Sequence, residues 1–356
     1  MAERFVAKEV RLEHSAGPFN DPPFPNFVCF SLGLRPKKNG GGRLIMDLSR
    51  PFDYSVNDFI NKDFYTLRYC TVDDAIALIT KAGRSCLLSK TDLVGAFCLI
   101  PVHPSDWHYL CFFLNGKYYF GQFLPLGVRS SPALFNQLSL ILIWVIKKAG
   151  YTSALHYMDD FLFVGAPETS QCNDILTFMK AVCADLGVPL APEKTVSPTT
   201  TLDFLGITLD TVNFTLSIPD GKIQELTECL STFKDRHKAT KREILSLAGK
   251  LSWCTTCISA GRIFLRRILD LAMKARRLGH QLKLSPGFFD DLQWWTDFLP
   301  LWNGKASFLQ PYWTEPHSLD LYTDAAGSVG RCGFLAGKWF QILWPPWVIA
   351  LNPPIA

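Results

Sequence analysis

The stretch His156-Tyr157-Met158-Asp159-Asp160-Phe161 decides how this chain is interpreted. Two adjacent aspartates interrupt the apolar segment 154–164, which has the pattern of two strands folded around Met158-Asp159-Asp160. Such a strand pair would present both carboxylates at the exposed edge of a sheet. Because Asp also favours ordinary turns, the pair alone is weak evidence for catalysis, and the rest of the sequence has to be consulted.

A third carboxylate, Asp92, ends the apolar stretch 86–93, which we predict to be a strand. Transfer of a nucleotide to a 3′-hydroxyl uses one metal ion to activate the attacking oxygen and a second to hold the leaving group. Mg²⁺ prefers oxygen ligands, usually one or two carboxylates together with phosphate and water. Aspartates that converge from two strands therefore suit a two-metal site.

The elements around these aspartates alternate between strands and helices. Residues 1–23 are polar and then proline-rich, which predicts an extended lead-in. The predicted helices are 71–83, 131–148, 174–186, 222–236, 240–258 and 261–278. The predicted β elements are a hairpin with a glycine-rich tip at 27–48, a hairpin turn at 115–116 and a strand pair at 202–218. We expect an α+β fold in which the helices become dominant after residue 219.

Composition indicates a globular, intracellular protein of the cytoplasm or nucleus. Apolar residues make up 48% of the chain and charged residues 19%. The longest apolar run, 138–146, is too short to cross a membrane. The 11 cysteines are irregularly spaced, which predicts reduced thiols, and the pair Cys254 and Cys257 is interpreted as core rather than as half of a zinc site.

Positive charge is concentrated in one part of the chain. Residues 233–283 hold 13 Lys and Arg against 3 Asp and Glu, so the remainder carries 4 − 10 = −6. A basic segment beside an acidic remainder predicts a polyanionic partner, although a solvated helical face would give the same pattern.

Two segments together resemble the reverse transcriptase family: Phe-Leu-Pro-Leu-Gly-Val-Arg-Ser-Ser-Pro at 123–132 and the stretch 156–161. The resemblance implies a right-hand polymerase with fingers, a palm built on an antiparallel sheet, and a helical thumb. It also implies two Mg²⁺ ions, with Mn²⁺ as an alternative, held by Asp92, Asp159 and Asp160. The implied partners are an RNA template, a DNA primer or RNA–DNA hybrid, and dNTPs; the oligomeric state is left open.

The same resemblance assigns the nucleotide pocket. Phe97 would lie under the incoming sugar and disfavour a ribose 2′-hydroxyl, and the Leu93 carbonyl would be an additional metal ligand. Arg43 would bind the triphosphate together with either Lys37 or Lys38. The spacing of the two lysines from Arg43 is compatible with both. Lys194 would protonate the pyrophosphate leaving group. Leu126 and Gly127 are implied to border the nucleotide, whereas Asp47 and Asn57 are implied to have structural or template-strand roles.

Contacts to the primer and template are implied farther along the chain. Phe204, Leu205 and Gly206 correspond to the hairpin that grips the primer. The basic residues Lys241, Arg242, Arg266 and Arg267 would meet backbone phosphates, giving binding that is independent of sequence and sensitive to salt.

At the far end, Leu321-Tyr-Thr-Asp324 resembles the first strand of a ribonuclease H domain, in which Asp324 would be the first of four metal-binding carboxylates. Residues 325–356 contain no Asp or Glu, so we expect a truncated, inactive start of that domain. The expected divisions are a lead-in at 1–23, fingers and palm at 24–218, a thumb and connection at 219–300, and a connection with the ribonuclease H-like start at 301–356.

Leu126 departs from the retroviral pattern, which usually has Gln at that position. With Asp47-Leu-Ser-Arg-Pro51 and Ser55-Val-Asn-Asp-Phe-Ile60, it points to retrotransposons of the tyrosine-recombinase (DIRS-like) group, whose elements continue into a full nuclease and a recombinase for DNA integration. Two alternatives remain: a non-catalytic retroelement relic that binds nucleic acid, and a viral RNA polymerase, which Phe97 and Met158 disfavour.

Overall fold

The computed structural model describes residues 2–36, 42–51, 53–308, 320–326, 329–346 and 349. The chain divides into two compact units, Met1–Phe308 and Leu309–Ala356. Lys37 and Lys38, predicted to lie near the nucleotide, fall outside the described residues, and Arg43 lies on strand β4 (Gly42–Met46).

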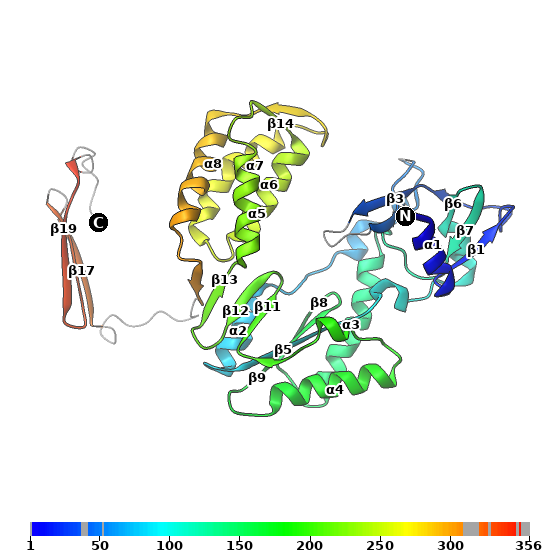
Figure 1. The fold of residues 1–356 in the computed structure, drawn as a ribbon, viewed down its shortest axis with the longest axis horizontal. Coiled ribbons are helices and arrows are strands. Elements are labelled where there is room, and N and C mark those ends of the chain that lie inside the picture. The colour runs from blue at the N-terminus through cyan, green and yellow to red at the C-terminus, as the bar shows by residue number, and fades with distance from the viewer. Residues whose placement is uncertain are drawn as a thin grey trace. The chain divides into compact units, whose positions relative to one another are not determined.

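The centre of the first unit is an antiparallel sheet, here called the palm sheet, with the strand order β10-β5-β9-β8 (Figure 1). The strands are β5 (Leu87–Asp92), β8 (Ala154–Tyr157), β9 (Asp160–Gly165) and β10 (Val196–Thr199). Helices α3 (Ser131–Lys148) and α4 (Gln171–Asp185) pack their apolar side chains on Phe161 and Phe163 of β9.

Leu162 and Val164 alternate with those phenylalanines and pack with helix α2 (Val72–Ala82) in a second cluster. Because the sheet is buried on both faces, β9 is apolar at nearly every position after Asp160. Helix α2 begins at Thr71, whose side chain forms a capping box with Asp74, and ends at Gly83, as predicted.

The fingers sheet has the order β1-β7-β6-β2, formed by β1 (Ser15–Phe19), β2 (Cys29–Phe30), β6 (Cys111–Leu114) and β7 (Lys117–Gly121). A separate hairpin joins β3 (Leu32–Pro36) to β4. Helix α1 (Ala2–Arg11) packs against Phe112 through Val6 and Val10, so the prediction of an extended lead-in was wrong. Those valines recur at helical spacing, and the sheet supplies the apolar surface that covers them.

A third sheet has the order β11-β12-β13-β16. Its strands are β11 (Thr201–Phe204), β12 (Ile207–Asp210), β13 (Thr215–Ser217) and β16 (Lys305–Ser307). The predicted strand pair at 202–218 is therefore three strands, and the fourth comes from nearly a hundred residues later in the chain.

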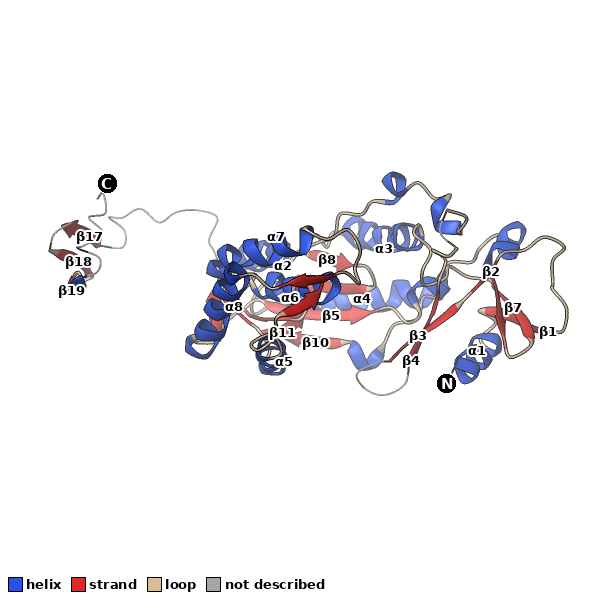
Figure 2. Cartoon of the chain, turned by 90° about the horizontal axis from the view of Figure 1, so that it is seen from above, coloured by secondary structure: helices blue, strands red, loops and turns tan. Residues whose placement is uncertain are grey.

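The thumb helices, α5 (Asp220–Ser231), α6 (Lys241–Cys254), α7 (Arg266–Met273) and α8 (Pro286–Phe298), follow this sheet (Figures 1 and 2). A short strand pair, β14 (Lys238–Thr240) and β15 (Gln281–Lys283), lies beside them. The core cluster that includes Leu88 continues through these helices, and Cys254 and Cys257 are buried in it, in agreement with the core interpretation.

Short 3₁₀ helices complete the first unit: η1 (Val56–Asp58), η2 (Lys62–Tyr65), η3 (Ala96–Leu99), η4 (Pro104–Leu110), η5 (Pro192–Lys194), η6 (Ser259–Leu265) and η7 (Leu299–Leu301). The second unit holds a three-stranded antiparallel sheet of β17 (Leu321–Ala326), β18 (Gly330–Leu335) and β19 (Lys338–Leu343). None of the helices among the described residues has the length and apolarity that a membrane crossing requires.

Candidate active site

Two neighbouring palm strands bring the predicted carboxylates together. In the antiparallel register of β5 and β9, Asp92 lies opposite Asp160. The Leu93 amide donates a hydrogen bond to the Asp159 carbonyl at 3.1 Å, so the two strand ends stay paired beyond the ladder. Asp92 is only 5% exposed, although it is an ionisable side chain. The structure thus places all three aspartates at one end of the palm sheet.

The turn that carries Asp159 is held by helix α3. Met158 has a left-handed backbone conformation with φ of 56°, which tightens the connection between β8 and β9. The Ser139 hydroxyl donates to the Met158 carbonyl at 2.8 Å, and a His156 ring nitrogen lies 3.1 Å from the Asn136 amide oxygen. Both contacts fix the turn to α3, which explains why a strained conformation persists there.

The carboxylates make the site strongly electronegative. Burial, a hydrogen bond with Asp92 and the charges of Asp92 and Asp159 raise the pKa of Asp160 to about 7. Lys194 opposes this effect: its ammonium group donates to Asp92 Oδ2 at 2.8 Å, and this bond raises the pKa of Lys194. Three converging carboxylates offer oxygen ligands only, and such a set fits hard divalent cations.

A cavity of about 540 Å³ opens in front of the aspartates. Phe97, Leu126 and Lys194 line it together with Asp92 and Asp160. The Phe97 ring packs edge-on against Phe135 of α3, with centroids 5.6 Å apart, so its position is fixed from behind. Side chains of the N-terminal helix, among them Phe5 and Glu9, line the same cavity, which the prediction of an extended lead-in did not anticipate.

Asn57 shapes the loop that contains Leu126 and Gly127. Its amide nitrogen donates to the Gly127 carbonyl at 2.8 Å, and its oxygen accepts from the Arg129 amide at 2.8 Å. Gly127 has φ of 125°, and a Cβ there would lie 2.3 Å from the Met46 carbonyl oxygen, so the loop needs glycine. Asn57 therefore has a structural part beside the nucleotide pocket.

The hairpin predicted to grip the primer is supported by the first long thumb helix. Phe204 is buried, whereas Leu205 and Gly206 form the tight turn, with φ of 50° and 83°. Trp253 of α6 donates from its indole nitrogen to the Leu205 carbonyl at 3.2 Å. The sequence analysis missed Trp253, because its contact lies 48 residues away along the chain.

The four basic residues predicted to meet phosphates have different surroundings. Arg242 and Arg266 are exposed, with Arg266 in a long ion pair to Asp270 at 3.5 Å. The Lys241 ammonium instead donates to the Ala275 carbonyl at 2.7 Å.

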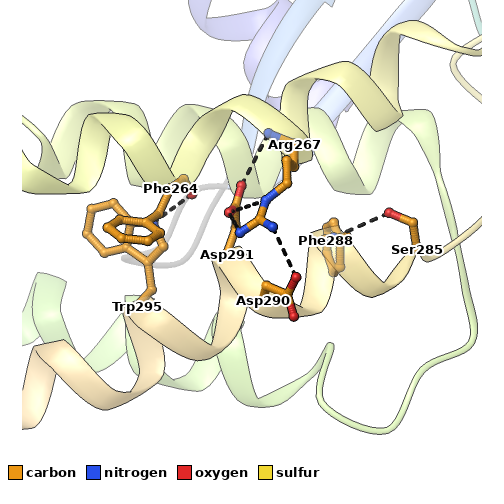
Figure 3. A network of polar contacts seen from close by, with 7 residues as sticks. All are labelled: Phe264, Arg267, Ser285, Phe288, Asp290, Asp291 and Trp295. Atoms are coloured by element: carbon orange, nitrogen blue, oxygen red, sulfur yellow. Dashed lines mark hydrogen bonds and ion pairs between the residues drawn. The ribbon is translucent and has the colours of Figure 1, made fainter. Parts of the chain in front are cut away.

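Arg267 is held between Asp290 and Asp291 of α8, at 3.0 Å and 2.5 Å (Figure 3). Asp291 is 1% exposed, so it needs that positive partner. Arg267 therefore joins α7 to α8 within the thumb, and because its side chain is 47% exposed, its predicted contact with phosphate stays a prediction.

The antiparallel sheet has three aspartates at one end and is flanked by a fingers sheet and a set of thumb helices. This is the architecture of a right-hand polymerase. Residues 36–209 match the family model described as "Reverse transcriptase (RNA-dependent DNA polymerase)". This segment, slightly less than half of the chain, is therefore similar to the reverse transcriptase family.

Curated relatives are viral polyproteins and polymerases. "Gag-Pro-Pol polyprotein" of human T-cell leukemia virus 3 is 29% identical over 204 residues, covering 54% of this chain and 13% of that protein. "Polyprotein P3" of Commelina yellow mottle virus is 26% identical over 223 residues, covering 62% and 11%. "Protein P" of hepatitis B virus genotype D is 32% identical over 108 residues, covering 30% and 12%. The chain thus spans only about an eighth of the length of these relatives.

Solved structures agree on the fold. The foamy viral protease-reverse transcriptase in complex with double-stranded DNA matches with a TM-score of 0.62 at 16% identity, covering 97% of this chain and 56% of that one. The same viral protein in complex with an RNA/DNA hybrid matches with a TM-score of 0.62 at 15% identity, covering 98% and 43%. The predicted fold class, an α+β right-hand polymerase, is confirmed.

Proposed function

We propose that this chain is an RNA-directed DNA polymerase that adds dNTPs to the 3′-hydroxyl of a primer. The observation that carries the proposal is the convergence of Asp92, Asp159 and Asp160 beside Lys194, in front of a cavity large enough for a nucleotide. The viral relatives and the family match support the same reaction.

Asp92, Asp159 and Asp160 would hold two Mg²⁺ ions, or Mn²⁺ in their place, with the Leu93 carbonyl as an additional ligand. Bound there, the ions would lower the pKa of the primer hydroxyl and neutralise the leaving pyrophosphate. The raised pKa of Asp160 supports this assignment. Neighbouring carboxylates repel each other when both are ionised, and a bound cation would relieve that repulsion. Lys194 would return a proton to the leaving group from beside Asp92.

The nucleotide would lie in the cavity with its sugar on Phe97 and with Leu126 and Gly127 beside it. Arg43 and one of Lys37 and Lys38 would bind the triphosphate from the β3–β4 hairpin. A template–primer duplex would extend from the turn formed by Phe204, Leu205 and Gly206 to the basic residues of the thumb, which are Lys241, Arg242, Arg266 and Arg267. The related viral enzyme has been captured on double-stranded DNA and on an RNA/DNA hybrid, which supports these partners.

We further propose a retrotransposon of the DIRS-like group as the source, on the evidence of Leu126 and of residues 47–60. Asp324 lies on β17, opposite Cys332, and belongs to the proposed ribonuclease H-like start. An intracellular location stays a prediction.

Extension of a primed RNA template with dNTPs tests the proposal. The Asp159→Asn variant should lose extension, whereas Asp185→Asn at the exposed end of α4 should retain it. Extension that survived Asp159→Asn would sink the assignment. A wild-type protein that binds hybrid without extending it would instead identify a relic. Incorporation of rNTPs in preference to dNTPs would indicate an RNA polymerase.

A further inference from the structure

Three side chains with metal-binding atoms meet in the wall of the active-site cavity, apart from the aspartates. They are Glu9 of α1, His14 of the connection that follows it, and Cys98 of η3. Their ligand atoms all lie within 4.8 Å of one another, and each side chain is partly buried. In the part of the chain that the structure describes, this is the one group of three such residues at this spacing.

Pairing between strands and aromatic packing bring these residues together from positions far apart in the sequence. The His14 carbonyl accepts from the Gln122 amide at 3.0 Å, and its ring packs edge-on against Phe123, with centroids 5.4 Å apart. One ring nitrogen, Nδ1, lies 2.8 Å from the Glu9 carboxylate. On the other side, the Cys98 amide donates to Gly95 at 2.7 Å, which holds the turn after β5. His14 and Cys98 are therefore held in place by contacts outside the cluster, and Glu9 is held by helix α1.

An ion pair between His14 and Glu9 does not explain why the Cys98 thiol lies beside them. Burial and the nearby Glu9 carboxylate raise the pKa of Cys98 to about 11, with Lys8 opposing them only weakly. The carboxylate of Glu9 disfavours the thiolate form of Cys98, because the two negative charges would repel each other. A bound cation would reverse that relation, since it attracts both.

The mixture of donors indicates which ion would bind. Nitrogen, sulfur and carboxylate oxygen in one site suit Zn²⁺, whereas Mg²⁺ prefers oxygen alone. All three residues line the cavity of about 540 Å³, so water could occupy a fourth position. Three protein ligands with one open position is an arrangement that zinc commonly adopts.

We propose that Glu9, His14 and Cys98 bind a Zn²⁺ ion that fastens helix α1 to the segment bearing Phe97. On binding, the Cys98 thiol releases its proton to solvent and the thiolate joins the metal; Glu9 binds ionised and His14 binds neutral. No electron is transferred. The ion would thereby join the N-terminal helix to η3, which carries a wall of the nucleotide pocket.

Titration of the intact chain with Co²⁺, in the presence of excess Mg²⁺ to occupy the aspartates, tests the proposal without measuring polymerase activity. Wild type should develop the absorption of a cobalt–thiolate bond, saturating at one ion per chain. Cys98→Ser should lose that absorption, and His14→Asn should weaken binding at least about 100-fold, because loss of a supporting partner alone costs 10–100-fold. Cys29→Ser, which removes an exposed thiol elsewhere, is the matched control and should behave as wild type.

Thermal unfolding provides a second measurement. Zn²⁺ should raise the Tm of wild type and of Cys29→Ser, because ligands that bind only the folded state stabilise it. It should leave the Tm of His14→Asn and Cys98→Ser nearly unchanged. A cobalt–thiolate absorption that persists in Cys98→Ser, or is missing from wild type, overturns the proposal. Neither result bears on primer extension, so the two proposals fail separately.

Discussion

Lys194 lies directly beside the proposed metal-binding carboxylates, through its 2.8 Å bond to Asp92. Its side chain is 56% exposed while that of Asp92 is 7% exposed, so the lysine reaches the site from the solvent side. That position suits a group that exchanges protons with solvent and delivers one to a departing phosphate.

Replacement of Lys194 by Gln should lower the rate of nucleotide addition by about 10²–10⁴-fold, the usual contribution of a general acid. Affinity for primed template should change little, because the residue is proposed to act on the leaving group. Single-turnover extension and a filter-binding assay measure the two quantities. Lys180→Gln, at an exposed position on α4, is the control. An unchanged rate in Lys194→Gln would remove the residue from the mechanism.

Phe97 should set the preference for deoxynucleotides. Its ring lines the cavity and is packed against Phe135. A ribose 2′-hydroxyl would therefore clash with a ring that cannot move away. Phe97→Ala should raise rNTP incorporation relative to dNTP incorporation by at least about tenfold, since steric contacts of this size are worth about 1–3 kcal/mol. Competition between the two nucleotides measures the ratio. Phe113→Ala, on the fingers sheet, should leave it unchanged.

Among individual residues, the sequence predicted those that the pairing of neighbouring strands is enough to bring together. Asp92, Asp159 and Asp160 follow from two apolar strands and a turn, which antiparallel pairing aligns. The contacts of Asn57 with Gly127 and of Glu9 with the cavity were not predictable in this way, because they depend on how separate sheets and helices pack. The partners of Arg267 on α8 were likewise not predictable from the local sequence.

Among the secondary-structure elements, helix α6 shows how local sequence specifies a boundary. Thr240 and Glu243 form a capping box, with the Glu243 carboxylate accepting from the Thr240 amide and hydroxyl, both at 2.7 Å. Arg236 donates to the same carboxylate at 2.7 Å. Because Trp253 on this helix supports the primer-grip turn, the stability of α6 bears on the proposed primer contacts.

The cap should make stability depend on pH. Its bonds from Thr240 and Arg236 lower the pKa of Glu243 to about 2 from the ordinary value of 4.5. A lowered folded-state pKa contributes stability that is present above 4.5 and is lost as the pH falls towards 2. Glu243→Gln should therefore be less stable than wild type at pH 7, and the difference should shrink as the pH falls through that window.

Urea unfolding at several pH values measures this difference. Thr240→Ala should lower the free energy of unfolding at pH 7 by about 1 kcal/mol, the usual effect of losing an N-cap residue. Glu228→Gln, an exposed change on α5, should show neither effect. A stability difference between wild type and Glu243→Gln that stays constant from pH 7 to pH 3 would contradict the account.

Helices with clear end signals were predictable, and those that depend on packing were not. Helix α3 occupies the predicted range Ser131–Lys148, with proline in its first turn and two lysines in its last. Helix α8 was not predicted, although Ser285 and Pro286 signal its start and Phe288, Leu292 and Trp295 recur at helical spacing on its buried face. Gly261 packs directly on Trp295 of that helix, a contact that appears only once α8 is folded onto η6.

For the whole molecule, the boundary between the two units decides which part of the chain can act alone. The sequence analysis placed a change of character near residue 301, where Trp, Pro and Gly become frequent. The first unit instead extends to Phe308, because β16 adds to the third sheet with Leu216 opposite Ala306. Phe308 is 7% exposed, its ring stacks on Phe214 with centroids 5.3 Å apart, and its amide donates to the Phe214 carbonyl at 2.9 Å.

A chain ending at Phe308 should therefore unfold in urea with the same midpoint as the first unit of the full chain, and it should retain primer extension. A chain ending at Gly304 loses β16 and the buried phenylalanine. Burying a side chain of that size is worth about 1.5–3 kcal/mol, so this shorter chain should be less stable by at least about 2 kcal/mol. If the two truncated chains were equally stable, β16 would be dispensable and the boundary would belong near residue 301. If the longer one were itself destabilised, residues beyond Phe308 would have to contribute to the first unit.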